Sequence, residues 1–194
     1  MQRLSALILL IILFPLILIF WLIVKFTSPG PFIFSQKRAG KNFEPFTIFK
    51  IRSMQEKAEE RKKDYLSLNE ADGPVFKIRE DPRLTPIGRF ISRTGLDEML
   101  QLINIIKGEM SFVGPRPLPV DEAMKIPEKY KKRFTVKPGI TSLWVIHGAH
   151  KLTFSEWMKS DLEYIKKKNA LLDLYILAIT LILIFRWTFK QLIP

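Results

Sequence analysis

The sequence predicts an α+β fold that is rich in helix, contains one small β-hairpin and is attached to a membrane. Three observations support this prediction. Residues 4–24 carry no charged side chain, two β-type runs lie on either side of a turn, and several later segments place apolar residues at helical spacing. We therefore expect an N-terminal membrane helix over residues 1–27, a basic domain over 28–169 and an apolar C-terminal helix over 170–194.

The first segment has the length of a membrane helix. Its 21-residue uncharged run, from Leu4 to Val24, would form a helix roughly 31 Å long, close to the thickness of a bilayer core. A signal peptide would have a shorter apolar run and a small-residue cleavage site. Pro15 lies near the middle, where it removes a backbone donor and breaks or kinks the helix. The segment can form either a kinked helix that spans the membrane or a re-entrant helix. The cations Arg3 and Lys25 at the two ends of the segment favour the re-entrant form.

A β-hairpin is expected next. Ser28–Pro31 ends the membrane helix with two prolines and a glycine. The runs Phe32–Gln36 and Phe46–Ile51 alternate in the manner of strands and are separated by a short polar loop. Lys50 and Arg52 then place two cations at the end of the second strand.

Five later segments are expected to be helical. Gln55–Leu68 is highly charged and predicts a solvated helix or a mobile arm. Asp81–Ile91 combines apolar residues at helical spacing with arginines, which predicts an interfacial amphipathic helix or a half-buried surface helix. Val120–Phe134 predicts an interrupted basic helix, and Phe154–Ile165 an amphipathic one. The 16 residues Ala170–Phe185 are short for a span, so we expect a helix docked on the domain or lying in the interface, with a second span as the alternative.

Charge and composition narrow the function classes. Residues 25–169 carry about +10 of the net +12, which predicts a domain on the cytoplasmic face of the cell membrane and attraction to anionic lipid or phosphate-bearing ligands. The absence of cysteine excludes disulfides and thiolate catalysis. His147 and His150 alone are weak evidence for zinc. Neither a dinucleotide nor a Walker motif is present, and we expect no nucleic-acid partner.

Asp97 and Glu98 are the candidate catalytic residues. Thr94–Asp97 matches a capping pattern, and taken alone a structural cap is the simpler interpretation. However, a carboxylate can also attack phosphorus to form an acyl phosphate. To approach an anionic diphosphate it needs cations, most simply Mg²⁺ together with basic side chains.

The sequence offers several such cations. Arg116 is the most constrained, because it lies between Pro115 and Pro117. The candidate substrate-binding residues are Lys50, Arg52, Arg89, Arg93, Arg116 and Pro117.

A series of motifs adds a resemblance to a known family. In chain order they are Ser28–Asn42, Phe46–Met54, Asp81–Ile91, Leu96–Glu98, Lys107–Pro117, Val136–Thr141 and Leu172–Leu174. In residues and in order they resemble the bacterial sugar transferase family, the monotopic polyprenyl-phosphate phosphoglycosyl transferases. The short length resembles the catalytic module alone, without the extra membrane helices of larger members.

The resemblance implies a reaction and a role for each residue. A phospho-sugar would pass from a UDP-sugar to polyprenyl (undecaprenyl) phosphate with release of UMP, initiating glycan assembly at the inner membrane. Asp97 would be the nucleophile that becomes a phospho-sugar ester, Glu98 its partner acid, and Mg²⁺ would bind at the pair. Arg116 would contact the nucleotide phosphate. The resemblance also implies a re-entrant helix broken at Pro15.

The sequence also predicts binding partners and leaves one alternative function. We expect both substrates and membrane lipid as partners, and a homodimer stays open. The alternative function is a non-catalytic basic module that binds anionic lipid or a partner protein at the membrane surface. The chain also departs from the family where Ser142–His150 reads S-L-W-V-I-H-G-A-H in place of G-L-W-Q-V-S-G-R, so the identity of the sugar is not carried over.

Overall fold

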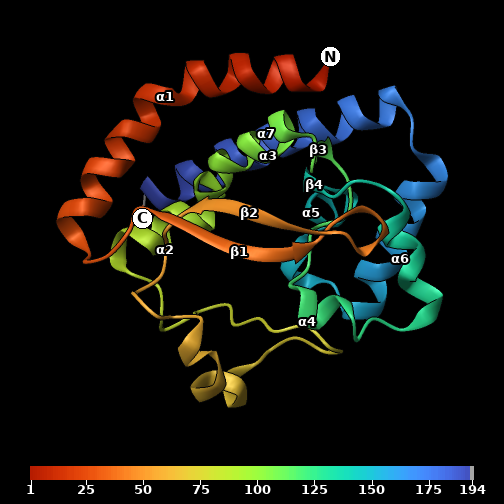
Figure 1. Ribbon diagram of the computed structural model, residues 1–194, viewed down its shortest axis with the longest axis horizontal. Coiled ribbons are helices and arrows are strands. Elements are labelled where there is room, and N and C mark those ends of the chain that lie inside the picture. Colours follow the sequence, from red (N-terminus) through yellow and green to blue (C-terminus); the bar gives the residue numbers. More distant parts are fainter. Residues whose placement is uncertain (193–194) are drawn as a thin grey trace.

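Two long apolar helices lie along one side of the molecule in the computed structural model (Figure 1), which describes residues 1–192 except the side chains of His150 and Leu192. These helices are α1 (Gln2–Thr27) and α7 (Ala170–Leu192). The expected C-terminal segment 170–194 ends in two residues outside the described part. A hairpin and several short helices fill the space beneath.

Helix α1 bends about midway along its length (Figure 1). Pro15 lies inside this helix, and proline is the usual cause of a sharp bend because it removes one hydrogen bond and crowds the preceding turn. The break expected near Pro15 is therefore a bend within one continuous helix. The re-entrant path through a membrane remains a prediction.

Helix α7 is longer than the sequence suggested. It continues beyond the 16-residue apolar run through Arg186 and Lys190, so shortness no longer argues against a span. By length and composition alone, α1 and α7 could each cross a membrane, with mean hydropathies of 3.4 and 2.0 and only 17% and 11% of their most apolar windows buried. For α7, a spanning path and an interfacial one both stay open.

The predicted hairpin is confirmed. Strands β1 (Ile33–Ala39) and β2 (Pro45–Ile51) are antiparallel and pair from Ile33 with Ile51 to Ala39 with Pro45. Asn104 of α3 fixes one edge of β2, because its side chain accepts from the Phe49 amide and donates to the Thr47 carbonyl. A second small sheet pairs β3 (Ser111–Val113) with β4 (Gly139–Thr141) in parallel.

The remaining helices are short. The α-helices are α2 (Pro86–Thr94), α3 (Leu102–Lys107), α4 (Val120–Ala123), α5 (Leu143–Ile146) and α6 (Phe154–Lys167). The 3₁₀ helices are η1 (Lys41–Phe43), η2 (Glu60–Leu68), η3 (Leu96–Gln101), η4 (Glu128–Thr135) and η5 (Ala149–Lys151).

The segment Asp81–Ile91 is only partly helical. Thr85 caps α2 by accepting from the Gly88 amide, so the helix begins at Pro86. Before it, Arg83 forms a buried ion pair with Asp81 at 2.7 Å. The expectation that this segment lies in lipid headgroups is therefore wrong for Arg83, whose charge is already compensated inside the protein.

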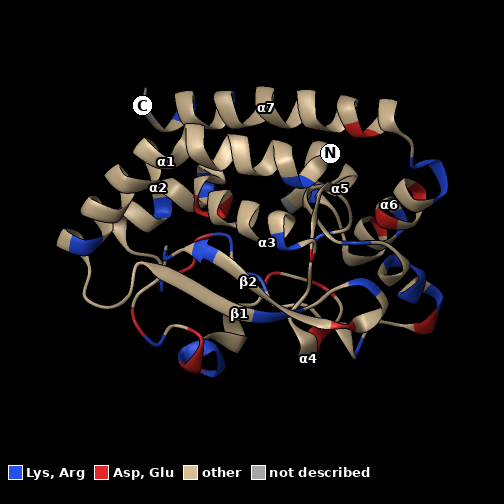
Figure 2. Ribbon diagram, turned by 45° about the horizontal axis from the view of Figure 1, so that its top comes forward, with Lys and Arg blue, Asp and Glu red and all other residues tan. Residues whose placement is uncertain are grey.

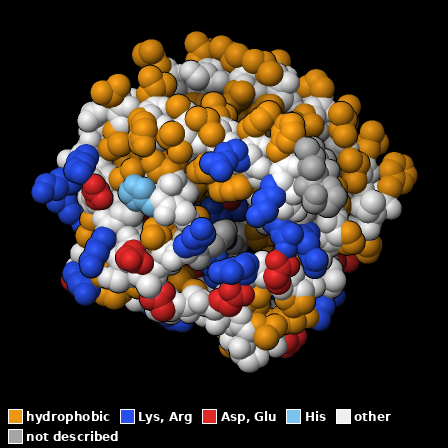
Figure 3. Space-filling model, turned by 180° about the vertical axis from the view of Figure 1, so that it is seen from behind, with side chains coloured by type: hydrophobic (Ala, Val, Ile, Leu, Met, Phe, Trp, Pro, Cys, Tyr) orange, Lys and Arg blue, Asp and Glu red, His pale blue; other side chains and the backbone are white. Residues whose placement is uncertain are grey.

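Charge and apolar surface are segregated. Figure 2 shows α1 and α7 almost free of charged residues, whereas Lys, Arg, Asp and Glu concentrate on the other elements. Hydrophobic side chains likewise gather along the top of the face in Figure 3, above a hollow with Lys and Arg at its rim. Exposed apolar residues of α1 include Leu4, Ile8 and Ile12. This distribution is what a domain lying against a membrane requires.

We predict that the buried pair between Arg133 of η4 and Asp161 of α6 is a principal determinant of stability. The Arg133 Nη2–Asp161 Oδ2 distance is 2.8 Å, and both side chains are 1% exposed. Asp161→Ala would leave an uncompensated buried guanidinium, which we expect to lower the unfolding free energy by about 3–5 kcal/mol. Urea unfolding in detergent measures this effect.

The matched control is Glu163→Ala on the same helix. Glu163 pairs with Lys167 at the surface, and its loss should cost less than about 0.5 kcal/mol. Equal effects of the two substitutions would contradict the assignment.

Candidate active site

The acid pair lies in a tight turn between two helices. Gly95 ends α2 in the left-handed conformation, with φ +76°, which glycine adopts without strain. The chain then enters the 3₁₀ helix η3, whose first turn carries Asp97 and Glu98. Strand β2 lies against η3, which brings Lys50 to these acids.

The capping interpretation of this turn is wrong. Thr94 is the last residue of α2, and its hydroxyl donates to the carbonyl oxygens of Phe90 and Ile91. The residue that precedes η3 is Gly95, which has no side chain to cap it. Asp97 therefore has no capping role, and its burial needs another reason.

Two cations compensate the acids. Lys50 Nζ lies 2.7 Å from Glu98 Oε1 and 3.5 Å from Asp97 Oδ2. Arg116 Nη1 lies 3.1 Å from the same Glu98 oxygen, and its guanidinium carbon is 5.7 Å from the Trp144 ring centre. Glu98 is thus held by both cations, whereas Asp97 has only the longer contact with Lys50.

The two carboxyl groups consequently differ in acidity. Burial raises the pKa of Asp97 above its usual range, against the opposing effect of Lys50. Burial acts on Glu98 in the same sense, but Lys50 and Arg116 together outweigh it and lower the pKa of Glu98 to about 2. At neutral pH Glu98 is a fixed negative charge, whereas Asp97 is desolvated and has the more basic carboxyl group of the two.

A cavity of about 640 Å³ opens at this point, and Asp97, Lys50 and Arg116 line it. Glu98 is not among its lining residues. Asp97 is therefore the carboxylate that a ligand in the cavity can reach, and Glu98 holds the two cations from behind.

The cavity wall contains buried polar atoms whose hydrogen-bonding capacity is not satisfied. Among the described residues, Gln36 Oε1 and Arg38 Nε are buried without a hydrogen bond, and both side chains line the cavity. Lys77 lies nearby, with its pKa lowered to about 8 by burial and by the charges of Arg116 and Arg79. A ligand that carries hydroxyl donors for Gln36 Oε1 and anionic oxygens for Arg38 and Lys77 would satisfy these groups.

Arginines that the sequence did not indicate hold the Arg116 loop. Arg133 Nη2 donates to the Arg116 carbonyl at 2.9 Å, and Arg38 Nη1 donates to the Pro117 carbonyl at 3.1 Å. Burial and the charge of Arg116 lower the pKa of Arg38 to about 10. Arg38 falls within the motif Ser28–Asn42, which was the available signal for it, whereas nothing local distinguishes Arg133.

The other predicted residues are placed differently. Pro117 and Arg52 line the cavity, but the Arg52 guanidinium donates to the Ser28 and Pro29 carbonyls and so fixes the exit from α1. Arg93 pairs with Glu80 at the surface, and Arg89 is exposed. The structure does not bring Arg89 or Arg93 into the cavity.

The donor set suits Mg²⁺ better than zinc. No group of three or more His, Cys, Asp or Glu that could hold a metal occurs in the part of the chain that the structure describes, and the side chain of His150 lies outside that part. Mg²⁺ commonly uses only one or two carboxylates and completes its shell with water and substrate phosphate oxygens. Asp97 offers one such carboxylate from the cavity wall, whereas Glu98 is paired with Lys50 and Arg116 and would have to exchange a cation to become the second ligand.

The geometry defines a buried acid pair compensated by two cations, at the wall of a cavity. Comparison with known proteins then assigns the chain to a family. The family model described as "Bacterial sugar transferase" matches residues 1–187. Galactosyl transferase CpsE of Streptococcus agalactiae is 46% identical over 153 residues, which cover 78% of this chain and 34% of the relative.

Two further relatives extend the comparison. The undecaprenyl-phosphate galactose phosphotransferase of Salmonella typhimurium is 35% identical over 180 residues, 89% of this chain and 37% of the relative. The exopolysaccharide production protein ExoY of Rhizobium meliloti is 33% identical over 177 residues, 89% of this chain and 78% of the relative. The chain belongs to the bacterial sugar transferase family. It spans about a third of the first two relatives.

We predict opposite stability effects for the two adjacent acids. Because burial raises the folded-state pKa of Asp97, its ionisation opposes folding as the pH rises above the unfolded-state pKa, and Asp97→Asn should raise the thermal midpoint at pH 7. Because the pKa of Glu98 is lowered, its stabilisation is full at pH 7 and is lost as the pH falls towards about 2. Glu98→Gln should therefore destabilise by about 1–3 kcal/mol.

Thermal unfolding in detergent with a metal chelator measures both variants. The exposed acid Asp121 supplies the control, since Asp121→Asn should leave the midpoint nearly unchanged. A lower midpoint for Asp97→Asn would contradict the assignment.

Proposed function

We propose that this protein moves a sugar 1-phosphate from a UDP-sugar to polyprenyl (undecaprenyl) phosphate and releases UMP. The observation that carries this proposal is the asymmetry of the acid pair. Asp97 faces the cavity with a raised pKa, and Glu98 behind it holds Lys50 and Arg116. The names of two relatives, a galactosyl transferase and an undecaprenyl-phosphate galactose phosphotransferase, support a sugar as the transferred group and undecaprenyl phosphate as the acceptor.

The first step is attack by a carboxylate oxygen of Asp97 on the phosphorus that bears the sugar. The bond from this phosphorus to the oxygen bridging the two phosphates breaks, and UMP leaves with the bond's electrons. Lys50 and Arg116 line the cavity and would offset the charge of the diphosphate. Mg²⁺ bound by Asp97 and Glu98 would further reduce the repulsion between the carboxylate and the diphosphate.

The second step returns Asp97 to its starting form. An oxygen of polyprenyl phosphate attacks the same phosphorus, and the acyl phosphate bond breaks to give a polyprenyl diphosphate sugar. Two displacements at one phosphorus need one nucleophile and a cavity that admits the two substrates in turn. The product would initiate exopolysaccharide, capsule, O-antigen or glycoprotein glycan assembly.

The fold is suited to an acceptor carried in a membrane. Met99 and Leu100 of η3 belong to the same apolar cluster as Ile17, Phe20 and Val24 of α1. The acid pair is therefore close to the apolar helix that we propose as the membrane anchor. We place the domain on the cytoplasmic face of the inner membrane, because its net charge is strongly positive.

We expect a covalent intermediate on Asp97. Purified protein incubated with Mg²⁺ and a panel of UDP-sugars, without polyprenyl phosphate, should gain the mass of one phospho-sugar and release one equivalent of UMP. Asp97→Asn should gain no mass and lose at least about 10³-fold in turnover, since it removes the nucleophile.

Asp121→Asn is the matched control and should behave as the unmodified chain does. UMP release with acceptor but no adduct would overturn the covalent route and leave direct transfer. No release with any donor would favour the non-catalytic alternative.

The membrane path of α1 has its own test. Since the chain contains no cysteine, Gln2→Cys introduces a single thiol at the start of α1. A re-entrant helix predicts labelling by an impermeant reagent only from the side that also labels Glu60→Cys on the exposed η2. Labelling of the two variants from opposite sides would show a spanning helix.

A further inference from the structure

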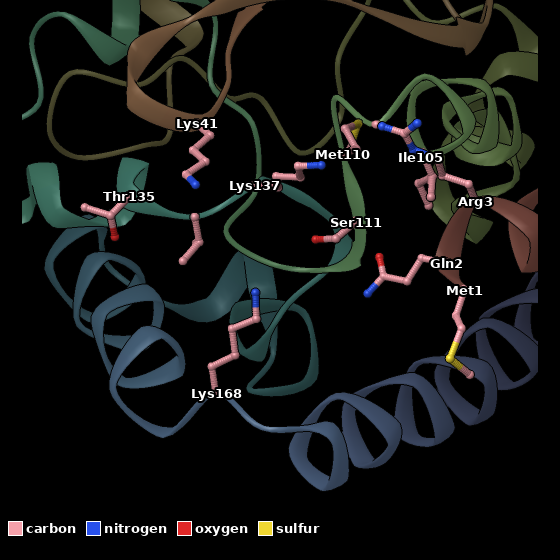
Figure 4. A pocket seen from close by; sticks show the side chains of 12 residues that line it. Met1, Gln2, Arg3, Lys41, Ile105, Met110, Ser111, Thr135, Lys137 and Lys168 are labelled. Carbon is pink, nitrogen blue, oxygen red and sulfur yellow. The ribbon is translucent and has the colours of Figure 1, made fainter.

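A second cavity, of about 520 Å³, lies apart from the acid pair and shares no lining residue with the first. Four cations line it, each from a different part of the chain: Arg3, Lys41, Lys137 and Lys168. We name it the basic pocket. Figure 4 shows Lys41 and Lys168 extending toward the same space from opposite sides, whereas Lys137 points toward Met110 and Arg3 lies at the other end of the pocket. The convergence of four segments distinguishes it from an ordinary run of surface lysines.

Among the residues that the structure describes, no acidic side chain compensates the charges of the basic pocket, although Lys168 Nζ lies 5.9 Å from the centre of the Tyr164 ring. None of its lining residues is acidic. In the described part of the chain, none of the four cations takes part in an ion pair. Cations that converge without an acid repel one another and create a positive potential within the cavity, which favours a bound anion.

The position of the basic pocket indicates where the anion comes from. Arg3 lies in the first turn of α1, and Lys168 lies two residues before α7 begins. Both apolar helices therefore start at this pocket. Beyond Arg3, α1 exposes Leu4, Leu7 and Ile8. A ligand in the pocket would have its charged group among the cations and room for an apolar tail along the helix, which is the arrangement of a membrane lipid.

We propose that the basic pocket binds the phosphate headgroup of an anionic membrane lipid. This site is separate from the cavity of the proposed reaction, and only the lipid source of the phosphate rests on the membrane location proposed above. The lipid would hold the end of the domain where α1 and α7 begin against the bilayer. Free phosphate shares the headgroup chemistry, so the test must distinguish the two.

The experiment compares two triple variants of the full chain, purified in detergent and freed of lipid. The pocket variant is Lys41→Gln, Lys137→Gln, Lys168→Gln. The control variant is Lys125→Gln, Lys132→Gln, Lys166→Gln, which removes the same charge from exposed lysines that line neither cavity. Binding is titrated by native mass spectrometry with phosphatidylglycerol, with phosphatidylcholine and with inorganic phosphate.

We expect saturable binding of one phosphatidylglycerol, weakened at least about tenfold in the pocket variant and less than about twofold in the control. Phosphatidylcholine, which has no net charge, should bind weakly and equally to all three proteins. If inorganic phosphate binds, loses affinity in the pocket variant but not in the control, and phosphatidylglycerol does not bind, the pocket is an anion site for free phosphate and the lipid assignment is overturned. Equal losses in both variants, or no saturable binding of either anion, would overturn the proposal.

Two controls keep the outcome separate from the proposed function. The thermal midpoint of the pocket variant should not fall, because its lysines make no ion pair in the described structure and their removal relieves repulsion between like charges. Formation of the Asp97 adduct should also persist in detergent. If the unmodified chain forms no adduct but binds phosphatidylglycerol as expected, the proposed reaction fails and this inference stands.

Discussion

The ion-pair network centred on Glu98 is the interaction on which the site depends. One carboxylate joins Lys50 of the hairpin to Arg116 of the loop after β3, and Glu98 itself lies in η3. Three segments far apart in sequence are thereby fixed to one another by charge. Burying these groups costs free energy unless each finds a partner with good geometry. Glu98 has two such partners, Lys50 and Arg116, whereas Asp97 has only the 3.5 Å contact with Lys50. A carboxylate that is less fully paired is more basic, which is what the proposed nucleophile requires.

The surrounding contacts make the network rigid. Arg38 and Arg133 donate to the carbonyl oxygens of Pro117 and Arg116, so the loop that carries the Arg116 guanidinium is held from two sides. Arg133 is in turn compensated by Asp161 in a fully buried pair. A chain of ion pairs and hydrogen bonds therefore runs from α6 through η4 to the acid pair. Groups held in this way need little rearrangement when charge develops on a substrate, which is how preorganised sites lower a barrier.

Part of this arrangement could be predicted from the sequence, and part could not. The hairpin, the acid pair and Arg116 follow from local patterns, because strand alternation, adjacent carboxylates and flanking prolines are properties of short segments. Arg89 and Arg93 were selected for charge alone. The phase of α2 buries Gly88, Ile91 and Thr94 and turns both arginines outward, away from the cavity. The capping interpretation failed for a related reason, since Thr94 ends one helix and does not begin the next. Arg133 acts only through tertiary contacts, which no local pattern encodes.

Helix α1 connects the two sites. Its second half contributes Ile17, Phe20 and Val24 to the apolar cluster that also contains Met99 and Leu100, next to the acid pair. Its first residues line the basic pocket. The bend of α1 therefore separates two halves with different contacts. The second half packs beside the acid pair, and the first residues line the proposed lipid site. A straight helix of this length could not follow the domain surface at both places. The bend at Pro15 therefore has a structural role whichever path α1 takes through a membrane. It lets the second half of the helix pack against the residues that follow the acid pair, while its first residues line the basic pocket.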